Sequence, residues 1–157
     1  MKKRSIVLIT VFSLFILTAC NAEVSETKVE EGITWYTNLE EALEVAQEKD
    51  VPVFIHFTGS DWCGWCWKLE EEVYSKQVFQ DYIAQNLVMV KIDFPRKIQL
   101  PKEVQAYNRN LANKYGIRGF PTVQLLNPDG SAIAQTGYQY GGAEVYIDHL
   151  KELLTNN

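Results

Sequence analysis

The chain has 157 residues, a length that suits one domain with short additional segments. Hydrophobic residues make up 46% of it and aromatic residues 12%, which is enough for a core and excludes an intrinsically disordered protein. The formal net charge is -5, and the body of the chain has no basic excess, so nucleic acid is not expected as a partner.

Residues 1–19 have the pattern of an export signal. A basic start, "MKKR", precedes an apolar run that is short for a membrane span, which needs roughly 20 residues. The run ends in "LTAC", which resembles the lipobox of bacterial lipoproteins and implies that Cys20 is lipidated as the first residue of the mature chain. A plain signal peptide cleaved elsewhere and an uncleaved anchor are the alternatives. Residues 20–33 are polar and acidic, and we interpret them as a tether to a domain over residues 34–157.

The first half of the domain alternates strand and helix patterns. A short extended piece leads to a helix whose N-cap is Asn38, because acidic residues fill its first turn and apolar residues follow one face. Residues 51–57 are β-branched and aromatic and predict a buried strand. A helix then begins at Cys63 and has a kink or restart near Ser75, and residues 87–94 predict a second buried strand.

The second half begins with a proline-bounded loop and a helix from about Lys102 to Tyr115. "FPTVQLLNPDGSAIAQTGY" predicts two strands joined by a type I turn, because Pro128 is pre-set for the second turn position. "GGAEVYIDHLKELL" predicts a closing helix. Helices between the early strands favour parallel pairing and the tight turn favours an antiparallel hairpin, so the sequence predicts an α/β fold.

Two of the three cysteines, Cys63 and Cys66, lie at the predicted start of a helix. A thiolate is the species that attacks a disulfide, and the unpaired N–H groups of a helix start favour negative charge on Cys63. Cys66 lies one turn further along on the same side, so it can displace a mixed disulfide formed at Cys63. Export would place the pair where disulfides persist. We therefore interpret the pair as a redox couple.

Two other interpretations of the pair stay open. A metal site needs more ligands, and the cysteines together with His56 would suit a soft ion such as Cu(I), whereas His149 belongs to the last predicted helix. A structural staple across so short a loop constrains the unfolded chain only slightly. Trp62 and Trp65 flank the pair either as packing around an exposed loop or as an apolar surface for an unfolded peptide.

"WCGWC" after a strand, "KYGIRGFPT" further along and "NPDG" in the final hairpin together resemble the thioredoxin superfamily over residues 34–155. Within it, "FTGSDWCGWC" is similar to exported, single-domain disulfide oxidoreductases of bacteria of the DsbH type. The resemblance implies a thioredoxin fold: a central mixed β-sheet flanked by helices, with an N-terminal βαβ unit and a C-terminal ββα unit.

The resemblance also implies a role for each site residue. Cys63 is then the nucleophile and Cys66 the resolving thiol, and no cofactor is needed beyond their redox-active disulfide. Pro121 is then a cis-proline that faces the cysteines, and the backbone at Phe120 and Thr122 pairs with an extended substrate. The alternative is that Pro121 simply starts a strand after a trans turn.

Three departures from thioredoxin stand out. Gly64–Trp65 replaces Gly-Pro between the cysteines and changes the redox potential in a direction that the sequence does not reveal. His56 takes the place of a buried aspartate, either as a proton acceptor for Cys66 or as a core histidine. An added segment over residues 95–110 is either a basic partner surface or a solvated stretch; its cations are Arg96, Lys97, Lys102 and Arg109. Asp61, beside the pair, is expected as a solvated turn residue or a helix cap.

These features predict a lipid-anchored thiol–disulfide oxidoreductase in the periplasm or at the cell surface. It is expected to act as a reductase or isomerase, with reduction favoured because the site resembles the reducing branch of the superfamily. Its expected partners are proteins with cysteines or disulfides, a membrane or periplasmic redox protein, and the membrane through the lipid anchor; the domain itself is expected to be a monomer. The rival functions are a lipid-anchored copper or haem-delivery chaperone that uses the same cysteines as ligands, and a purely structural thioredoxin-like domain.

Overall fold

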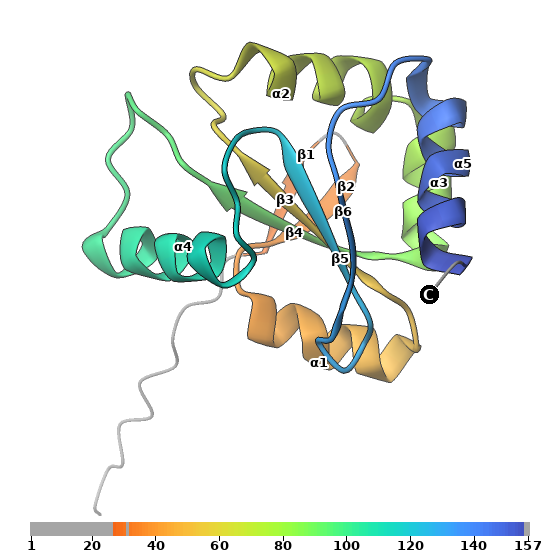
Figure 1. The fold of residues 1–157 in the computed structure, drawn as a ribbon, viewed down its shortest axis with the longest axis horizontal. Coiled ribbons are helices and arrows are strands. Elements are labelled where there is room, and N and C mark those ends of the chain that lie inside the picture. The colour runs from red at the N-terminus through yellow and green to blue at the C-terminus, as the bar shows by residue number, and fades with distance from the viewer. Residues whose placement is uncertain (1–26, 31, 156–157) are drawn as a thin grey trace, which may run out of the picture.

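The computed structural model describes residues 27–30 and 32–155 (Figure 1). The predicted signal segment and the lipidation of Cys20 lie outside these residues. Over the described ranges, none of the helices has both the length and the hydropathy needed to cross a membrane. The elements, in chain order, are β1 (Lys28–Glu30), β2 (Ile33–Tyr36), α1 (Leu39–Lys49), β3 (Val53–Thr58), α2 (Gly64–Leu69), the π-helical turn η1 (Glu70–Tyr74), α3 (Gln77–Asn86), β4 (Val88–Asp93), α4 (Lys102–Lys114), β5 (Thr122–Leu126), β6 (Ala132–Thr136) and α5 (Gly142–Thr155).

The strands form one mixed sheet in the order β1-β2-β4-β3-β5-β6. β4 pairs in parallel with both β2 and β3, whereas β5 pairs antiparallel with β3 and with β6. Helices cover both faces of the sheet, with α1 and α4 on one face and α2, α3 and α5 on the other (Figure 1). The predicted thioredoxin fold is therefore confirmed, including the parallel start and the antiparallel hairpin at the end.

β3 lies in the middle of the sheet and is buried along its whole length. Alternate side chains of a strand point to opposite faces, so β3 contributes to two cores. Phe54 packs into the core beneath η1, α3 and α5, and Ile55 and Phe57 pack into the core beneath α1 and α4. The continuous apolar run that predicted a buried strand is what this central position requires, and the strand leads directly into the cysteine motif.

Local signals in the sequence operate as expected. Asn38 caps α1 by accepting a hydrogen bond from the backbone N–H of Glu41 at 2.9 Å. The break predicted near Ser75 is also present: α2 widens into η1, and the Ser75 hydroxyl donates to the carbonyl of Glu71 at 2.7 Å before α3 begins. The cysteine helix is therefore short, and its continuation changes direction before it packs on the sheet.

The start of the domain differs from the prediction. β1 lies inside the segment that was interpreted as a tether over residues 20–33, and it pairs antiparallel with β2 so that Lys28 stands opposite Trp35. All three residues of β1 are exposed, so the strand lacks the alternation of apolar and polar residues that predicts a half-buried strand. The described domain thus begins at β1 rather than at residue 34.

Candidate active site

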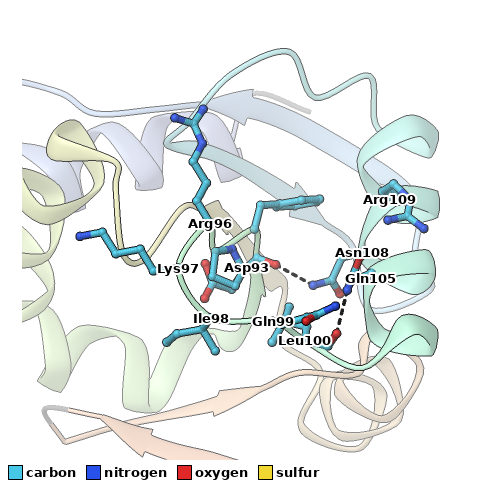
Figure 2. Close-up of a pocket in the computed structure, with 11 residues that line it drawn as sticks. Asp93, Arg96, Lys97, Ile98, Gln99, Leu100, Gln105, Asn108 and Arg109 are labelled. Carbon is cyan, nitrogen blue, oxygen red and sulfur yellow. Dashed lines mark hydrogen bonds between the residues drawn. The ribbon is translucent and has the colours of Figure 1, made fainter.

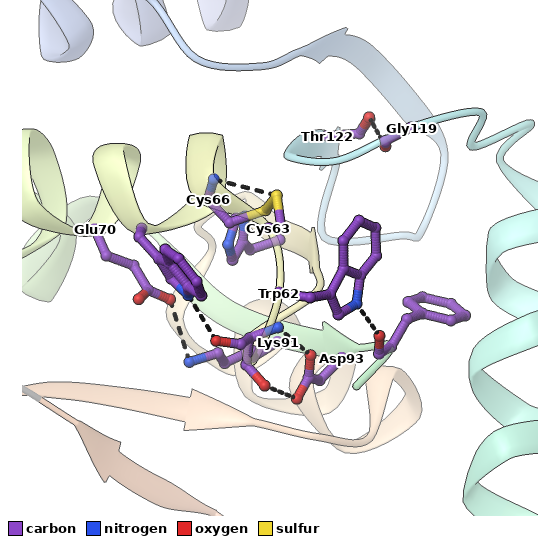
Figure 3. Close-up of a disulfide and its surroundings, with 12 residues drawn as sticks. Trp62, Cys63, Cys66, Glu70, Lys91, Asp93, Gly119 and Thr122 are labelled. Carbon is purple, nitrogen blue, oxygen red and sulfur yellow. Dashed lines mark hydrogen bonds and ion pairs between the residues drawn. A yellow bond between two sulfur atoms is a disulfide. The ribbon is translucent and has the colours of Figure 1, made fainter. Parts of the chain in front are cut away.

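Cys63 and Cys66 form a disulfide where β3 passes into α2 (Figure 3). Cys63 is the N-cap of α2, and its sulfur accepts a hydrogen bond from the backbone N–H of Cys66 at 3.2 Å. The side chain of Cys63 keeps 5% exposure, whereas Cys66 is fully buried. Both cysteines are therefore buried in the disulfide form, with Cys63 keeping slightly more exposure than Cys66.

The turn before Cys63 is held in one conformation by contacts with β4. The backbone N–H and the hydroxyl of Ser60 both donate to the Asp93 carboxylate, at 2.9 and 2.6 Å. Gly59 lies directly against the Trp62 indole, so a Cβ at residue 59 would overlap the ring. The backbone N–H of Cys63 donates to the Gly59 carbonyl at 2.9 Å. These bonds determine the direction in which α2 leaves the sheet.

A second segment approaches the disulfide from the start of β5. The Phe120–Pro121 peptide bond is cis, and Thr122 stands opposite Phe57 in the antiparallel register of β5 and β3. The Thr122 hydroxyl donates to the Gly119 carbonyl at 2.8 Å, and Figure 3 shows this segment across from the two cysteines. Residues far apart in the sequence therefore meet at one end of the central strands.

One side of the disulfide is walled by Trp62, Phe94 and Phe120, which we call the tied wall. The Trp62 indole N–H donates to the carbonyl of Phe94 at 2.8 Å (Figure 3). The Phe120 ring lies 5.8 Å from the Trp62 ring and stacks on Phe94 at 5.1 Å, measured between centroids. Trp62 and Phe120 are both partly buried, so packing accounts for much of their contact.

A second aromatic cluster, which we call the open wall, is formed by Trp65, the residue before Cys66, with Tyr138 and Tyr140. Their ring centroids lie between 5.2 and 6.3 Å from one another. Trp65 is 52% exposed and Tyr140 is 73% exposed, so this cluster faces solvent. The two tyrosines were missed at the sequence level, because they lie in the loop after β6 and the short segment "YQY" is the only local signal of them.

Tyr138 is held in the open wall by a small polar network. Its hydroxyl donates to the Glu72 carboxylate, and Glu72 forms an ion pair with Lys68 at 2.9 Å. The hydrogen bond from Tyr138 holds the pKa of Glu72 below its usual value, followed in effect by the bond from Lys68. The network joins the loop after β6 to the helical segment that follows Cys66.

His56 is fully buried in β3, with its ring edge-on to Tyr74 at 5.2 Å between centroids. Its Nδ1 lies 3.3 Å from the Tyr74 hydroxyl, and its Nε2 has no hydrogen-bond partner among the described residues. Burial, and after it the charge of Lys91, lowers the pKa of His56 to about 3. His56 is therefore neutral at physiological pH, and proton transfer to it from Cys66 stays a prediction.

Lys91, the residue opposite His56 in β4, is paired with acids on two other elements. Its ammonium lies 2.6 Å from a carboxylate oxygen of Glu30. It also lies 3.5 Å from a carboxylate oxygen of Glu70 (Figure 3). Although burial opposes its charge, these partners raise the pKa of Lys91 above the usual value. Glu30, on the unpredicted strand β1, is thus one of the two carboxylates that pair with Lys91.

The added segment after β4 is attached to the turn before the cysteines. The Asp61 carboxylate accepts hydrogen bonds from the backbone N–H groups of Arg96, Lys97 and Ile98, at 2.9, 2.6 and 3.2 Å. The N–H of Arg96 is the largest of the effects that lower the pKa of Asp61. Asp61 was expected as a solvated residue or a helix cap; instead it holds a loop from another part of the chain beside the active-site turn.

Within the described part of the chain, no three histidine, cysteine, aspartate or glutamate side chains are placed to share a metal ion. His149 lies on α5, and its Nε2 is 2.8 Å from the Thr136 hydroxyl. The two histidines considered as extra metal ligands therefore lie on different elements, and each contacts a hydroxyl group.

Comparison with known proteins agrees with this geometry. The profile of the thioredoxin-like domain matches residues 39–153. The chain belongs to the thioredoxin-like domain family. It is similar to the disulfide bond reductase DsbH of Chlamydia pneumoniae, with 34% identity over 114 residues that cover 73% of this chain and 69% of that protein.

A solved structure of a DsbH oxidoreductase superposes with a TM-score of 0.75 at 30% identity, and the match covers 85% of this chain and 94% of that one. The thioredoxin-related protein DsbJ of Chlamydia pneumoniae is 26% identical over 148 residues, which cover 90% of this chain and 42% of DsbJ. The family resemblance inferred from the sequence is thereby confirmed, and the chain is placed among thiol–disulfide oxidoreductases of the thioredoxin type.

Proposed function

We propose that this protein exchanges disulfides with extracytoplasmic proteins, mainly as a reductase and secondarily as an isomerase. The observation that carries the proposal is the Cys63–Cys66 disulfide at the start of α2, in a chain of the thioredoxin-like family. The relative with 34% identity is named a disulfide bond reductase, which supports reduction as the main direction.

The reaction begins from the dithiol form of the protein. The Cys63 thiolate attacks one sulfur of a client disulfide, so a mixed disulfide forms and one client thiolate leaves. Cys66 then attacks the Cys63 sulfur and releases the second client thiolate. Two electrons have passed to the client, and the protein is left with the Cys63–Cys66 disulfide that the structure contains. A redox partner must reduce this disulfide before the next cycle.

The local geometry suits these two roles. The N–H of Cys66 that donates to the Cys63 sulfur at 3.2 Å would stabilise a thiolate there, because a hydrogen bond to the charged form lowers a pKa. Complete burial of Cys66 disfavours its thiolate until the mixed disulfide has formed. Cys63 is thus the sulfur suited to attack and Cys66 the sulfur suited to resolve.

A client would bind as an extended segment across the disulfide. The backbone beside Pro121, at Phe120 and Thr122, would pair with the client strand, since this segment faces the cysteines (Figure 3). Trp62 and Trp65 would contact client side chains on opposite sides, and the half-exposed Trp65 offers the larger free surface. His56 is proposed either as a transient proton acceptor for Cys66 or as a neutral core residue.

The export pattern of residues 1–19 supports action outside the cytoplasm, and the lipobox resemblance at Cys20 supports a lipid anchor. Lipid attachment would hold a monomeric domain at a membrane surface, near membrane-bound redox proteins that could reduce it. Radiolabelled acyl-chain incorporation in bacterial cells, lost in Cys20→Ser, tests the anchor independently of the redox chemistry.

Trapping of a mixed disulfide tests the reaction. A Cys66→Ser variant should accumulate client proteins joined to Cys63 and released by dithiothreitol, and the Cys63→Ser variant should trap none. A redox titration against glutathione then tests the direction. A potential of about -270 mV would indicate a thioredoxin-like reductant. A potential of about -120 mV would indicate an oxidant and would contradict the proposal. Cu(I) binding at one ion per chain without insulin reduction would instead support the copper-chaperone alternative.

A further inference from the structure

The segment from Phe94 to Lys102 carries a charge opposite to that of the chain as a whole. It contains Arg96, Lys97 and Lys102 and no acidic residue, in a chain with a formal net charge of -5. Arg96, Lys97 and Ile98 are exposed. The segment follows β4 directly and forms part of the tied wall through Phe94, and Arg96 and Lys97 lie beside the active-site turn, bonded through their backbone N–H groups to Asp61.

Arg96 is the cation of this segment that is held against the site. Its guanidinium carbon lies 3.6 Å from the centroid of the Trp62 ring, and Trp62 precedes the nucleophile Cys63. A guanidinium that lies over an aromatic face keeps its N–H donors at its edge, where they can bind a carboxylate in two parallel bonds. None of the ion pairs among the described residues involves this guanidinium.

The backbone that carries Arg96 is fixed from two sides. Asp61 accepts the N–H groups of residues 96–98, so the carboxylate nearest in sequence to the nucleophile is engaged with main-chain donors. On the other side, the segment and α4 line an open cavity of about 510 Å³. Figure 2 shows that Asn108 of α4 donates to the carbonyl of Asp93, just before the segment, that Gln105 donates to the carbonyl of Leu100 within it, and that Arg96 extends away from α4.

We propose that Arg96 determines client specificity by binding the carboxylate of an acidic residue next to the reacting client cysteine. This inference rests on the proposed disulfide exchange and adds a class of substrate, namely protein disulfides with acidic flanks. A client cysteine bonded to Cys63 brings its neighbours within a residue or two of Trp62 and hence of the guanidinium, because consecutive Cα atoms are about 3.8 Å apart. Stacking has already restricted the arginine, so little further ordering is needed on binding.

The test compares model peptides that contain the same intermolecular disulfide and differ in one residue beside the cysteine: Glu, Gln or Lys. The second-order rate constant for reduction by the dithiol form of the full domain is measured for each. We expect the Glu peptide to react about tenfold faster than the Gln peptide at low ionic strength, in keeping with a charge-assisted bidentate bond. The Lys peptide should be slowest, and the spread should narrow as salt is added.

Arg96→Gln should bring the Glu-to-Gln rate ratio to about one, and Arg96→Lys should leave an intermediate ratio, because an ammonium cannot make the two parallel bonds. Because the measured quantity is the ratio of the rate constants for the Glu and Gln peptides, a variant that is generally less active still gives a valid ratio. Lys114→Gln is the matched control: it removes the same charge, from a lysine that lies 5.2 Å from the Tyr115 ring at the other end of α4, and should leave the ratio unchanged.

A ratio near one in the unchanged protein, or a tenfold ratio that survives in Arg96→Gln, would overturn the specificity role and leave the proposed exchange intact. Failure of the unchanged protein to reduce any of the peptides would overturn both. Anionic phosphatidylglycerol vesicles provide the remaining arm: if Arg96→Gln weakens vesicle binding while the peptide ratio stays the same, the guanidinium serves lipid headgroups and the acidic-client inference is wrong.

Discussion

The two walls beside the disulfide are built on different principles. The tied wall is bonded to the body of the domain: Trp62 donates to the Phe94 carbonyl, Phe94 and Phe120 pack against the core, and Asp61 holds the loop that follows Phe94. The open wall consists of rings that face solvent, with Trp65 52% exposed, and it is held mainly through the Tyr138–Glu72 bond. The two walls therefore have different roles. The tied wall positions the nucleophile and the cation beside it, whereas the open wall offers apolar surface for a client and contributes little to stability.

At neutral pH the largest effect is expected from Gly59→Ala, which should disrupt the tied wall. A Cβ there would overlap the Trp62 indole, which cannot move without losing its bond to Phe94. We expect a loss of about 3 kcal/mol in the free energy of unfolding, at the upper end of the range for overpacking. Urea titration measures it. Gly64→Ala is the control, because a Cβ at Gly64 meets nothing within 4 Å; an equal loss in both variants would show that steric overlap is not the cause.

Alanine substitution of the two tryptophans compares the walls directly. Trp62→Ala should reduce the free energy of unfolding by about 2 kcal/mol, because a half-buried ring and its hydrogen bond are lost. Trp65→Ala should change stability by less than about 0.5 kcal/mol and slow client reduction by about threefold to tenfold. Thermal unfolding and insulin turnover measure the two properties. Equal stability losses would mean that the open wall is not a free surface.

His56, in the central strand β3, should make the free energy of unfolding depend on pH in the acid range. His56 has its pKa lowered to about 3 by burial and by Lys91, so the unfolded chain takes up a proton near pH 6.5 that the folded protein does not bind. His56 therefore has no cost above that pH and destabilises the fold increasingly from about pH 6.5 down to about 3. The effect approaches about 1.4 kcal/mol per pH unit.

His56→Gln should remove this slope from urea titrations at a series of pH values. His149→Gln, which alters a histidine bonded to Thr136 near the surface of α5, is the comparison and should leave the slope in place. A slope that persists in His56→Gln would show that other groups cause the acid sensitivity. If His56→Gln also shifts the pH profile of the resolving step while the mixed disulfide forms normally, the proton-acceptor role gains support over the core role.

The smallest effect is local and concerns Asp61. Its carboxyl pKa is lowered by the N–H groups that it accepts, so its stabilisation is present above the unfolded pKa of about 3.9 and is lost as pH falls through the lower folded value. Asp61→Asn should reduce the hydrogen-exchange protection of the amides of residues 96–98 at pH 7. Asp129→Asn, in the distal hairpin, alters a carboxylate that accepts from Ser131 and should leave that protection unchanged.

Much of the fold could be predicted from short stretches of sequence. The apolar run of β3, the N-cap Asn38 and the break at Ser75 depend on residues within a few positions of one another, and all three are confirmed. β1 could not be predicted, because its three exposed residues carry no pattern and its strand identity comes from pairing with β2. Elements that are determined by neighbouring residues in the sequence could therefore be predicted, and a strand that forms only through pairing with another strand could not.

The candidate site divides in the same way. The position of Cys63 at the start of α2 could be predicted, whereas the neighbours of the two cysteines could not. Tyr138 lies more than seventy positions beyond Trp65 in the sequence, and Asp61 is separated from Arg96 by 35 positions. No local pattern indicates that such residues meet, and the tether interpretation failed at β1 for the same reason.

The sequence alone determines a thioredoxin-like succession of strands and helices and the place of a cysteine pair at a helix start. Those features arise from side-chain periodicity, capping groups and a fixed spacing, which act over one or two turns of chain. Only the tertiary structure decided that Asp61 anchors the added segment, that Arg96 lies on Trp62 and that His56 is buried and neutral. Each of these depends on distances and desolvation that exist once β3, β4 and the loops beyond them have packed together.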